Sequence, residues 1–247
     1  MAHPEQMAFF VDVVARFPER FGGRVLDVGS RDVNGGPHHL IDPRTYVGID
    51  LAAGRNVDVV ADGAMLPLPS ACVDVAMSSE CFEHTPAWEE VVGEMVRTLR
   101  PGGVLAFSAA ATGRREHGTT RSDGGAGSPG TSARGQEWYR NLTGRRVRRV
   151  LRRHGLHERV VYVDRRSSDV YAVAVQEPAG PADRAACVAV RRALRRRAGP
   201  NRLPRPWRQR AVLRVGGDAG LARLVTARVR VQARVRAWLG VRLGVRR

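Results

Sequence analysis

The sequence predicts an α/β fold built on a doubly wound, mostly parallel sheet. Short apolar runs that end at glycine or aspartate alternate with segments of helical periodicity, which is typical of strands connected by helices in a parallel sheet. The first apolar run covers residues 24–28 and ends at Gly29. The chain has 247 residues, of which 43% are hydrophobic, enough for one such domain with an extension.

The end of the first strand is the first candidate ligand site. Glycine lets a ligand approach the backbone, because it has no Cβ, and open α/β sheets bind ligands at the carboxyl ends of their strands. The stretch is not a dinucleotide fingerprint, which needs three glycines at fixed spacing. Ser30 and Arg31 follow Gly29, and the next glycine is Gly35.

The other elements follow from apolar periodicity and turn residues. A helix is expected over residues 5–17, where apolar side chains recur at three- and four-residue steps before Pro18. A second helix is expected to begin near Trp88, and a third, basic helix to cover residues 143–156. The further strands are expected at residues 45–50, 57–62, 72–80, 104–108, 157–164 and 169–176.

Two aspartates stand at strand ends where a ligand would lie. Asp50 ends the second strand, close to the spacing of about 20 residues expected for an acid that accepts hydrogen bonds from both ribose hydroxyls. Asp62 ends the third strand. The alternatives are ordinary structural ones, a helix N-cap for Asp50 and a turn residue for Asp62.

Several motifs occur together in one order. They are Asp27-Val28-Gly29, Gly48-Ile49-Asp50-Leu51, Asp62 with the following Leu66-Pro67, Glu80 to His84, and Leu99-Arg100-Pro101-Gly102-Gly103. Together they resemble the class I S-adenosylmethionine (SAM) methyltransferases, and in particular the type 11 methyltransferase group. The resemblance covers about residues 24–109. It departs from the family at Ser30-Arg31-Asp32, where many members have a cysteine or a glycine pair.

The resemblance implies a fold and a cofactor. The fold is a Rossmann-like, seven-stranded, mostly parallel sheet with an antiparallel last strand, and the cofactor is SAM. The residues implied to bind SAM stand at or just after the strand ends: Asp27, Gly29, Ser30, Asp50, Leu51, Asp62, Gly63 and Ser79.

Residues 110–144 are rich in glycine, serine, threonine and arginine. This segment is longer than a simple connection between two elements, so we expect a functional loop or lid on the side that faces the methyl acceptor. His117 on this loop is the first candidate general base, because histidine can be neutral near pH 7. His84 is the second candidate, with bracing of the loop as its alternative role. No His, Asp or Glu cluster shows metal-ligand spacing, so no required metal is predicted.

The methyl acceptor is inferred from a missing motif. Methyltransferases that act on amino groups of bases often carry Asn/Asp-Pro-Pro-aromatic after the fourth strand, where this chain has Ser78-Ser79-Glu80-Cys81. O-methylation of a small molecule, such as a sugar or secondary metabolite, is therefore favoured. Two alternatives stay open: an RNA-directed methyltransferase, and a SAM-binding or membrane-associated interaction protein without turnover.

The net charge of +17 is concentrated at the C-terminal end. We expect a methyltransferase domain over residues 1–177 and an arginine-rich extension over 178–247, in which Asp183 and Asp218 are the only acidic residues. The extension could bind anionic lipid, bind nucleic acid, or be weakly ordered. Neither a signal peptide nor an apolar run of membrane-spanning length is found. A cytoplasmic protein is therefore expected, peripheral to the membrane if the extension binds lipid.

Overall fold

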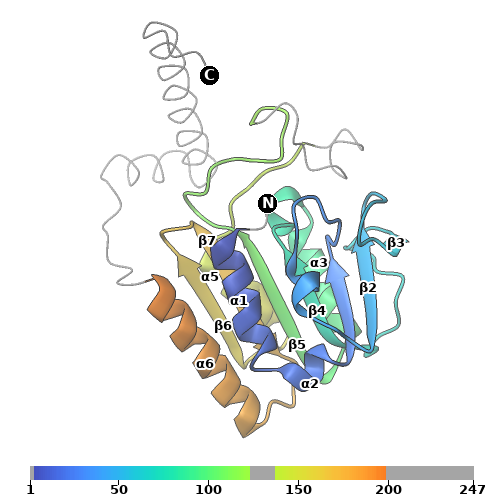
Figure 1. The fold of residues 1–247 in the computed structure, drawn as a ribbon, viewed down its shortest axis with the longest axis vertical. Coiled ribbons are helices and arrows are strands. Elements are labelled where there is room, and N and C mark those ends of the chain that lie inside the picture. The colour runs from blue at the N-terminus through green and yellow to red at the C-terminus, as the bar shows by residue number, and fades with distance from the viewer. Residues whose placement is uncertain (1–2, 123–136, 199–247) are drawn as a thin grey trace, which may run out of the picture.

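The computed structural model describes residues 3–122 and 137–198. They form one seven-stranded sheet of order β3-β2-β1-β4-β5-β7-β6 (Figure 1). The strands are β1 (Arg24–Val28), β2 (Thr45–Asp50), β3 (Val59–Val60), β4 (Val73–Ser79), β5 (Leu99–Ala110), β6 (Arg159–Asp164) and β7 (Asp169–Val175).

The strand directions confirm the predicted fold class. The pairs from β3 through β5 are parallel, and β7 runs antiparallel to both β5 and β6. From β1 the chain adds β2 and β3 on one side of the sheet, and it then returns to add β4 on the other side of β1. The boundary between β1 and β4 is therefore the switch point at which doubly wound sheets bind ligands. The sequence-predicted third strand, residues 57–62, is shorter in the structure and keeps only Val59 and Val60.

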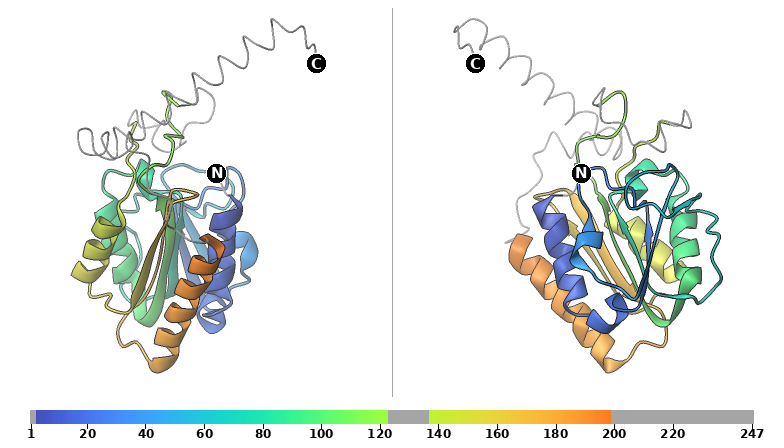
Figure 2. Two further views of the ribbon diagram at one scale, coloured as in Figure 1. Left: turned by 90° about the vertical axis from the view of Figure 1, so that its left-hand side faces the viewer. Right: turned by 45° about the vertical axis from the view of Figure 1, so that its right-hand side comes forward.

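Helices cover both faces of the sheet (Figure 2). On one face, α3 (Trp88–Thr98) and α5 (Gly144–Arg153) pack on side chains such as Leu26 and Leu105. On the other, α1 (Pro4–Val14), α2 (Pro18–Phe21) and α6 (Pro181–Ala198) pack on Val25 and Val173. The predicted helix over residues 5–17 is α1, which ends at Val14, and the separate short helix α2 begins at Pro18.

The described structure continues past the predicted domain boundary at residue 177. Helix α6 begins shortly after it, and its side chains Cys187, Val190 and Leu194 are buried in the same core as Phe9 and Val173. A helix whose apolar face is buried in this way belongs to the domain, which therefore extends to Ala198. The remainder of the predicted arginine-rich extension, residues 199–247, lies outside the described residues, as does the middle of the predicted lid, residues 123–136.

None of the helices within residues 3–122 and 137–198 is long and apolar enough to cross a membrane.

Candidate active site

The predicted SAM residues come together at the carboxyl edge of the sheet. The register pairs Val28 with Ile49 and Asp50 with Val60, so the ends of β1, β2 and β3 are direct neighbours. The loop that follows β5 leaves the sheet at this edge, where the N-terminal end of α1 also lies (Figure 1). The edge therefore combines the candidate cofactor residues with the candidate acceptor loop.

Gly29 shapes the turn after β1. Its φ of 77° lies in the left-handed region that favours glycine, and its N–H donates to the Ile49 carbonyl at 2.8 Å. A Cβ at this position would lie 2.6 Å from the Sγ of Cys81. The space that glycine leaves free is thus taken by the Cys81 side chain, which packs the segment after β4 against this turn.

Asp27 is a buried carboxyl, 2% exposed, at the end of β1. The Tyr46 hydroxyl donates to its Oδ2 at 2.8 Å, while Oδ1 has no hydrogen-bond partner in the described part of the chain. Burial raises the pKa of Asp27 to about 7, and the charge of Asp50 adds to this effect. A nearby cationic ligand would favour the ionised form of such a group.

Asp50 ends β2 with its carboxylate facing the loop after β1. Its Oδ2 accepts from the Arg31 N–H at 3.2 Å, and its Oδ1 accepts from the Ala52 N–H at 3.1 Å. Each carboxylate oxygen has a further lone pair. The residue can therefore hold the loop in place and still accept a hydrogen bond from a ligand hydroxyl.

Ser30 and Gly63 have structural contacts in the same region. The buried Ser30 hydroxyl donates to the Asn56 carbonyl at 2.8 Å, which ties the β1 loop to the segment before β3. A Cβ on Gly63 would lie 2.9 Å from Cγ1 of Val28. Close packing therefore explains this glycine without a ligand.

The remaining predicted SAM residues lie around the edge. Asp62 accepts from the Ala64 N–H at 2.9 Å, which forms a local turn. Leu51 is half-buried just after β2. The Ser79 hydroxyl accepts a hydrogen bond from the buried Gln6 side chain of α1. The structure thus places all eight residues along one edge, and several of them stabilise its loops.

The two predicted catalytic histidines meet in one cluster. Glu83 and His84 lie in a 3₁₀ turn, Phe82–His84, after β4, and His117 lies in the loop after β5. The ring centroids of His84, His117 and Tyr139 are 5.0–5.4 Å apart. Burial lowers the pKa of His84 to about 4, so its ring is neutral near pH 7.

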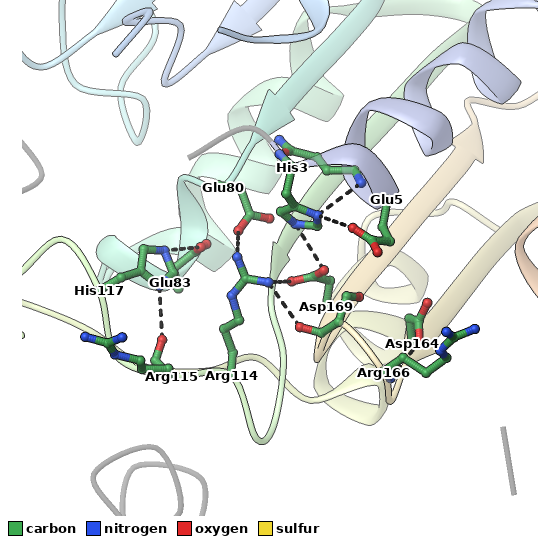
Figure 3. A network of polar contacts seen from close by, with 12 residues as sticks. His3, Glu5, Glu80, Glu83, Arg114, Arg115, His117, Asp164, Arg166 and Asp169 are labelled. Carbon is green, nitrogen blue, oxygen red and sulfur yellow. Dashed lines mark hydrogen bonds and ion pairs between the residues drawn. The ribbon is translucent and has the colours of Figure 1, made fainter. Parts of the chain in front are cut away.

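Both nitrogens of His117 face oxygen atoms of the chain. Nδ1 lies 3.1 Å from the Arg115 carbonyl, and Nε2 lies 3.5 Å from Oε1 of Glu83 (Figure 3). Glu83 is fully buried; although burial raises its pKa, the neighbouring His117 and His84 hold the pKa below its usual value. His117 could act as a base only after its ring turns away from one of these oxygens.

A neighbouring acidic network was not foreseen from the sequence. Arg114 lies between Asp169, whose Oδ1 accepts at 3.0 Å, and Glu80, whose Oε2 is 3.7 Å away (Figure 3). His3 contacts Asp169 at 3.2 Å. Glu80 has a φ of 51°, and such strain in a non-glycine residue is concentrated at functional sites. The Glu-x-x-x-His spacing marks Glu80, but no sequence signal connects it with residues 114 and 169.

The family model described as a methyltransferase domain matches residues 37–107. This range contains β2 to β5 except the last residues of β5, together with Asp50, Asp62, Glu83 and His84. This part of the chain is therefore similar to a methyltransferase domain. The sequence resemblance is thereby confirmed, on the part of the chain where the motifs are densest.

Curated relatives of this methyltransferase domain cover part of the chain. An uncharacterized methyltransferase of Mycobacterium ulcerans is 32% identical over 107 residues, which is 36% of this chain and 40% of that protein. A malonyl-[acyl-carrier protein] O-methyltransferase of Enterobacter lignolyticus is 34% identical over 110 residues, 40% of this chain and 43% of that protein. The chain thus matches less than half the length of these relatives.

Two of the solved structures that this chain resembles in part come from Burkholderia thailandensis and Haemonchus contortus. The Burkholderia thailandensis 1,6-didemethyltoxoflavin-N1-methyltransferase, bound to its substrate and S-adenosylhomocysteine, is 16% identical, with a TM-score of 0.48 and coverage of 69% of this chain and 79% of that one. A Haemonchus contortus phosphoethanolamine N-methyltransferase is 13% identical, with a TM-score of 0.48 and coverage of 68% and 52%.

Proposed function

We propose that the chain is a SAM-dependent methyltransferase that methylates an oxygen atom of a small molecule. The observation that carries the proposal is the Asp50 carboxylate at the end of β2, next to the Gly29 turn, inside a matched methyltransferase domain. Its free lone pairs suit the two hydroxyls of a ribose.

The other edge residues suit the remaining parts of SAM. Asp62 and Gly63 follow the neighbouring strand, where an adenine ring would lie beside Asp50. Asp27 offers an unpaired carboxyl oxygen, and its charge would favour a cationic sulfonium over a neutral sulfide. Leu51, Ser30 and Ser79 complete the proposed contacts. When bound, SAM supplies a methyl group on positively charged sulfur.

The chain's task in such a reaction is mainly positioning. A methyl transfer needs the acceptor lone pair aligned with the bond that breaks, and most of the rate comes from holding this geometry. Beyond β5, the rings of His117 and Tyr139 lie 5.1 Å apart between their centroids, and we place the acceptor beside them. His117 is the proposed proton acceptor for a hydroxyl substrate, and His84 is the second candidate.

The preference for an oxygen acceptor rests on two observations. The segment after β4 reads Ser78-Ser79-Glu80-Cys81, without the amino-methylation motif. In addition, one of the relatives is named an O-methyltransferase. The RNA-directed and non-catalytic alternatives rest mainly on the arginines of residues 199–247, which lie outside the described residues.

Calorimetric titration with SAM tests the cofactor, with NAD as the control ligand. We expect micromolar binding of SAM and none of NAD; a chain that does not bind SAM would disprove the proposal. The acceptor is then sought by incubating the chain with SAM and a panel of hydroxylated, carboxylated and amino compounds, and detecting methylated products by mass spectrometry. Products methylated on nitrogen alone would overturn the oxygen preference.

A further inference from the structure

The cluster of Glu83, His84 and His117 combines three potential metal ligands. One ligand atom from each side chain lies within 4.8 Å of the others. Glu83 is completely buried, and His84 is 7% exposed. The three residues come from two segments separated by the whole of α3 and β5, so only the tertiary fold brings them together.

Each of the three side chains in this cluster has at least one buried polar atom that lacks a hydrogen-bond partner. Within the described residues this holds for both Glu83 oxygens, His84 Nδ1 and His117 Nε2. Buried polar atoms are nearly always satisfied, and a buried charge is normally paired or coordinates a metal. Unpartnered atoms on all three side chains therefore indicate that a binding partner is missing from the cluster.

The spacing of the ligand atoms suits a small cation. Two ligands of a tetrahedral ion, each about 2.1 Å from the metal, lie about 3.4 Å apart. His117 Nε2 and Glu83 Oε1 are 3.5 Å apart, which is longer than a normal hydrogen bond. An ion can bind to this pair with little movement of either side chain.

The second nitrogen of His117 supports the same conclusion. Nδ1 lies 3.1 Å from the Arg115 carbonyl. Histidines that bind metals usually donate their other N–H to a carbonyl or carboxylate, which fixes the ring and leaves the free nitrogen for the ion. In this arrangement His117 Nε2 carries a lone pair directed at Glu83, as a ligand requires.

We propose that Glu83, His84 and His117 bind a divalent first-row transition-metal ion. Imidazole nitrogens favour ions such as Zn²⁺, Co²⁺ and Fe²⁺, whereas Mg²⁺ and Ca²⁺ prefer sites made of oxygen ligands. Three protein ligands leave at least one position for water or for a substrate oxygen. This proposal differs from the sequence-based expectation that no metal is required.

Two other groups in the described residues could hold a metal, but an arginine forms ion pairs with the carboxylates of each: Arg55 with Asp32, and Arg114 with Asp169 and Glu80. Asp32, near His38 and His39, accepts from Arg55 at 2.7 Å and from the Gly35 N–H at 2.6 Å. Asp169, near His3 and Glu80, accepts from Arg114 and from the Tyr171 hydroxyl. The ion pair of Glu83 is with His117 and not with an arginine, so its cluster is the one that an ion would complete.

The site lies beside the proposed SAM edge, because Cys81 packs on Gly29 only a few residues before Glu83. Its role in catalysis rests on the proposed function. With the ion bound, His117 Nε2 would be a ligand and no longer the proton acceptor, and an acceptor hydroxyl bound to the ion would lose its proton to water more readily. Its oxygen lone pair would form the new O–CH₃ bond while the S–CH₃ bond breaks, with that electron pair staying on sulfur as S-adenosylhomocysteine forms.

Binding of Co²⁺ to the untagged full chain tests the site, since its visible absorption reports coordination. We expect one ion per chain and weakening of at least tenfold in His117→Ala and in Glu83→Gln. His157→Ala, an exposed histidine elsewhere, is the matched control and should bind normally. Circular dichroism melts establish that each variant is folded; His117 is the more tolerant position, because its side chain is 29% exposed.

The outcomes separate this inference from the proposed function. Absence of saturable Co²⁺ binding, equal binding by the variants and wild type, or loss of binding in His39→Ala instead would overturn the metal site. Calorimetry with SAM is done on the same samples. A chain that binds SAM but no Co²⁺ rejects only the metal site, and a chain that binds Co²⁺ but no SAM rejects only the methyltransferase proposal.

Discussion

The Sγ of Cys81 occupies the space next to Gly29 that a side chain would need, 2.6 Å from the position of a Cβ. This contact joins the turn after β1 to the segment that carries Glu83 and His84. The loop proposed to hold SAM therefore packs directly against the segment that leads to the cluster proposed to face the acceptor.

Gly29→Ala should destabilise the fold more than Gly155→Ala. The two glycines have nearly the same φ, 77° and 76°, so both substitutions incur the left-handed backbone cost of about 1–2 kcal/mol. Only Gly29 adds a clash, because nothing lies within 4 Å of a Cβ at Gly155. Urea unfolding should show a further loss of about 1–3 kcal/mol for Gly29→Ala; equal losses would contradict the packing role.

Asp27→Asn should remove a loss of folding stability that grows with pH. The pKa of Asp27 rises from 3.8 to about 7 on folding, so the folded state holds its proton more tightly. Below about pH 4 both states are protonated and no penalty exists; the penalty grows to about 4 kcal/mol by pH 7 and is constant above it. The free energy of unfolding of the wild type should therefore fall relative to Asp27→Asn between pH 4 and 7. Parallel curves would refute this assignment.

Asp50→Ala should weaken SAM binding by about 1–3 kcal/mol, through loss of charge-assisted hydrogen bonds to the ribose. Asp58→Ala is a suitable control, since Asp58 also accepts from a backbone N–H, that of Gly48 in β2 at 2.7 Å, but is not proposed to touch SAM. Calorimetry on both variants separates ligand contact from loop stability. Unchanged affinity in Asp50→Ala would remove this residue from the site.

His117→Ala should lower turnover while SAM still binds. Loss of a general base typically reduces a rate by about 10²–10⁴-fold, and loss of a metal ligand would act in the same direction. Steady-state rates with the identified acceptor, together with SAM affinity, provide the measurement. Full activity of this variant would show that the proton leaves by another route.

Truncation after residue 198 should be tolerated, whereas truncation after residue 177 should not. The shorter chain loses α6 and exposes the core side chains that pack against Cys187, Val190 and Leu194. Burial of three such side chains contributes several kcal/mol, a large part of the stability of a domain. Thermal melts of the two truncated chains test this; similar melting temperatures would mean that α6 is dispensable.

Local patterns predicted most of the elements because apolar periodicity and turn residues act over a few neighbouring positions. The strands that end at Gly29 and Asp50 could be identified in this way. The shortness of β3 could not, because its length depends on pairing with β2 at the sheet edge. The place of α6 also escaped prediction, since its arginines concealed a buried face.

The sequence by itself determined the order of strands and helices, the resemblance to methyltransferases and the acids at the strand ends. Tertiary structure decided which distant groups meet. It placed Cys81 on Gly29, enclosed α6 in the core, and brought His117 to Glu83. The physical reason is that spacing along the chain fixes neighbours within one helix or strand, whereas contacts between loops depend on how the sheet and its covering helices pack.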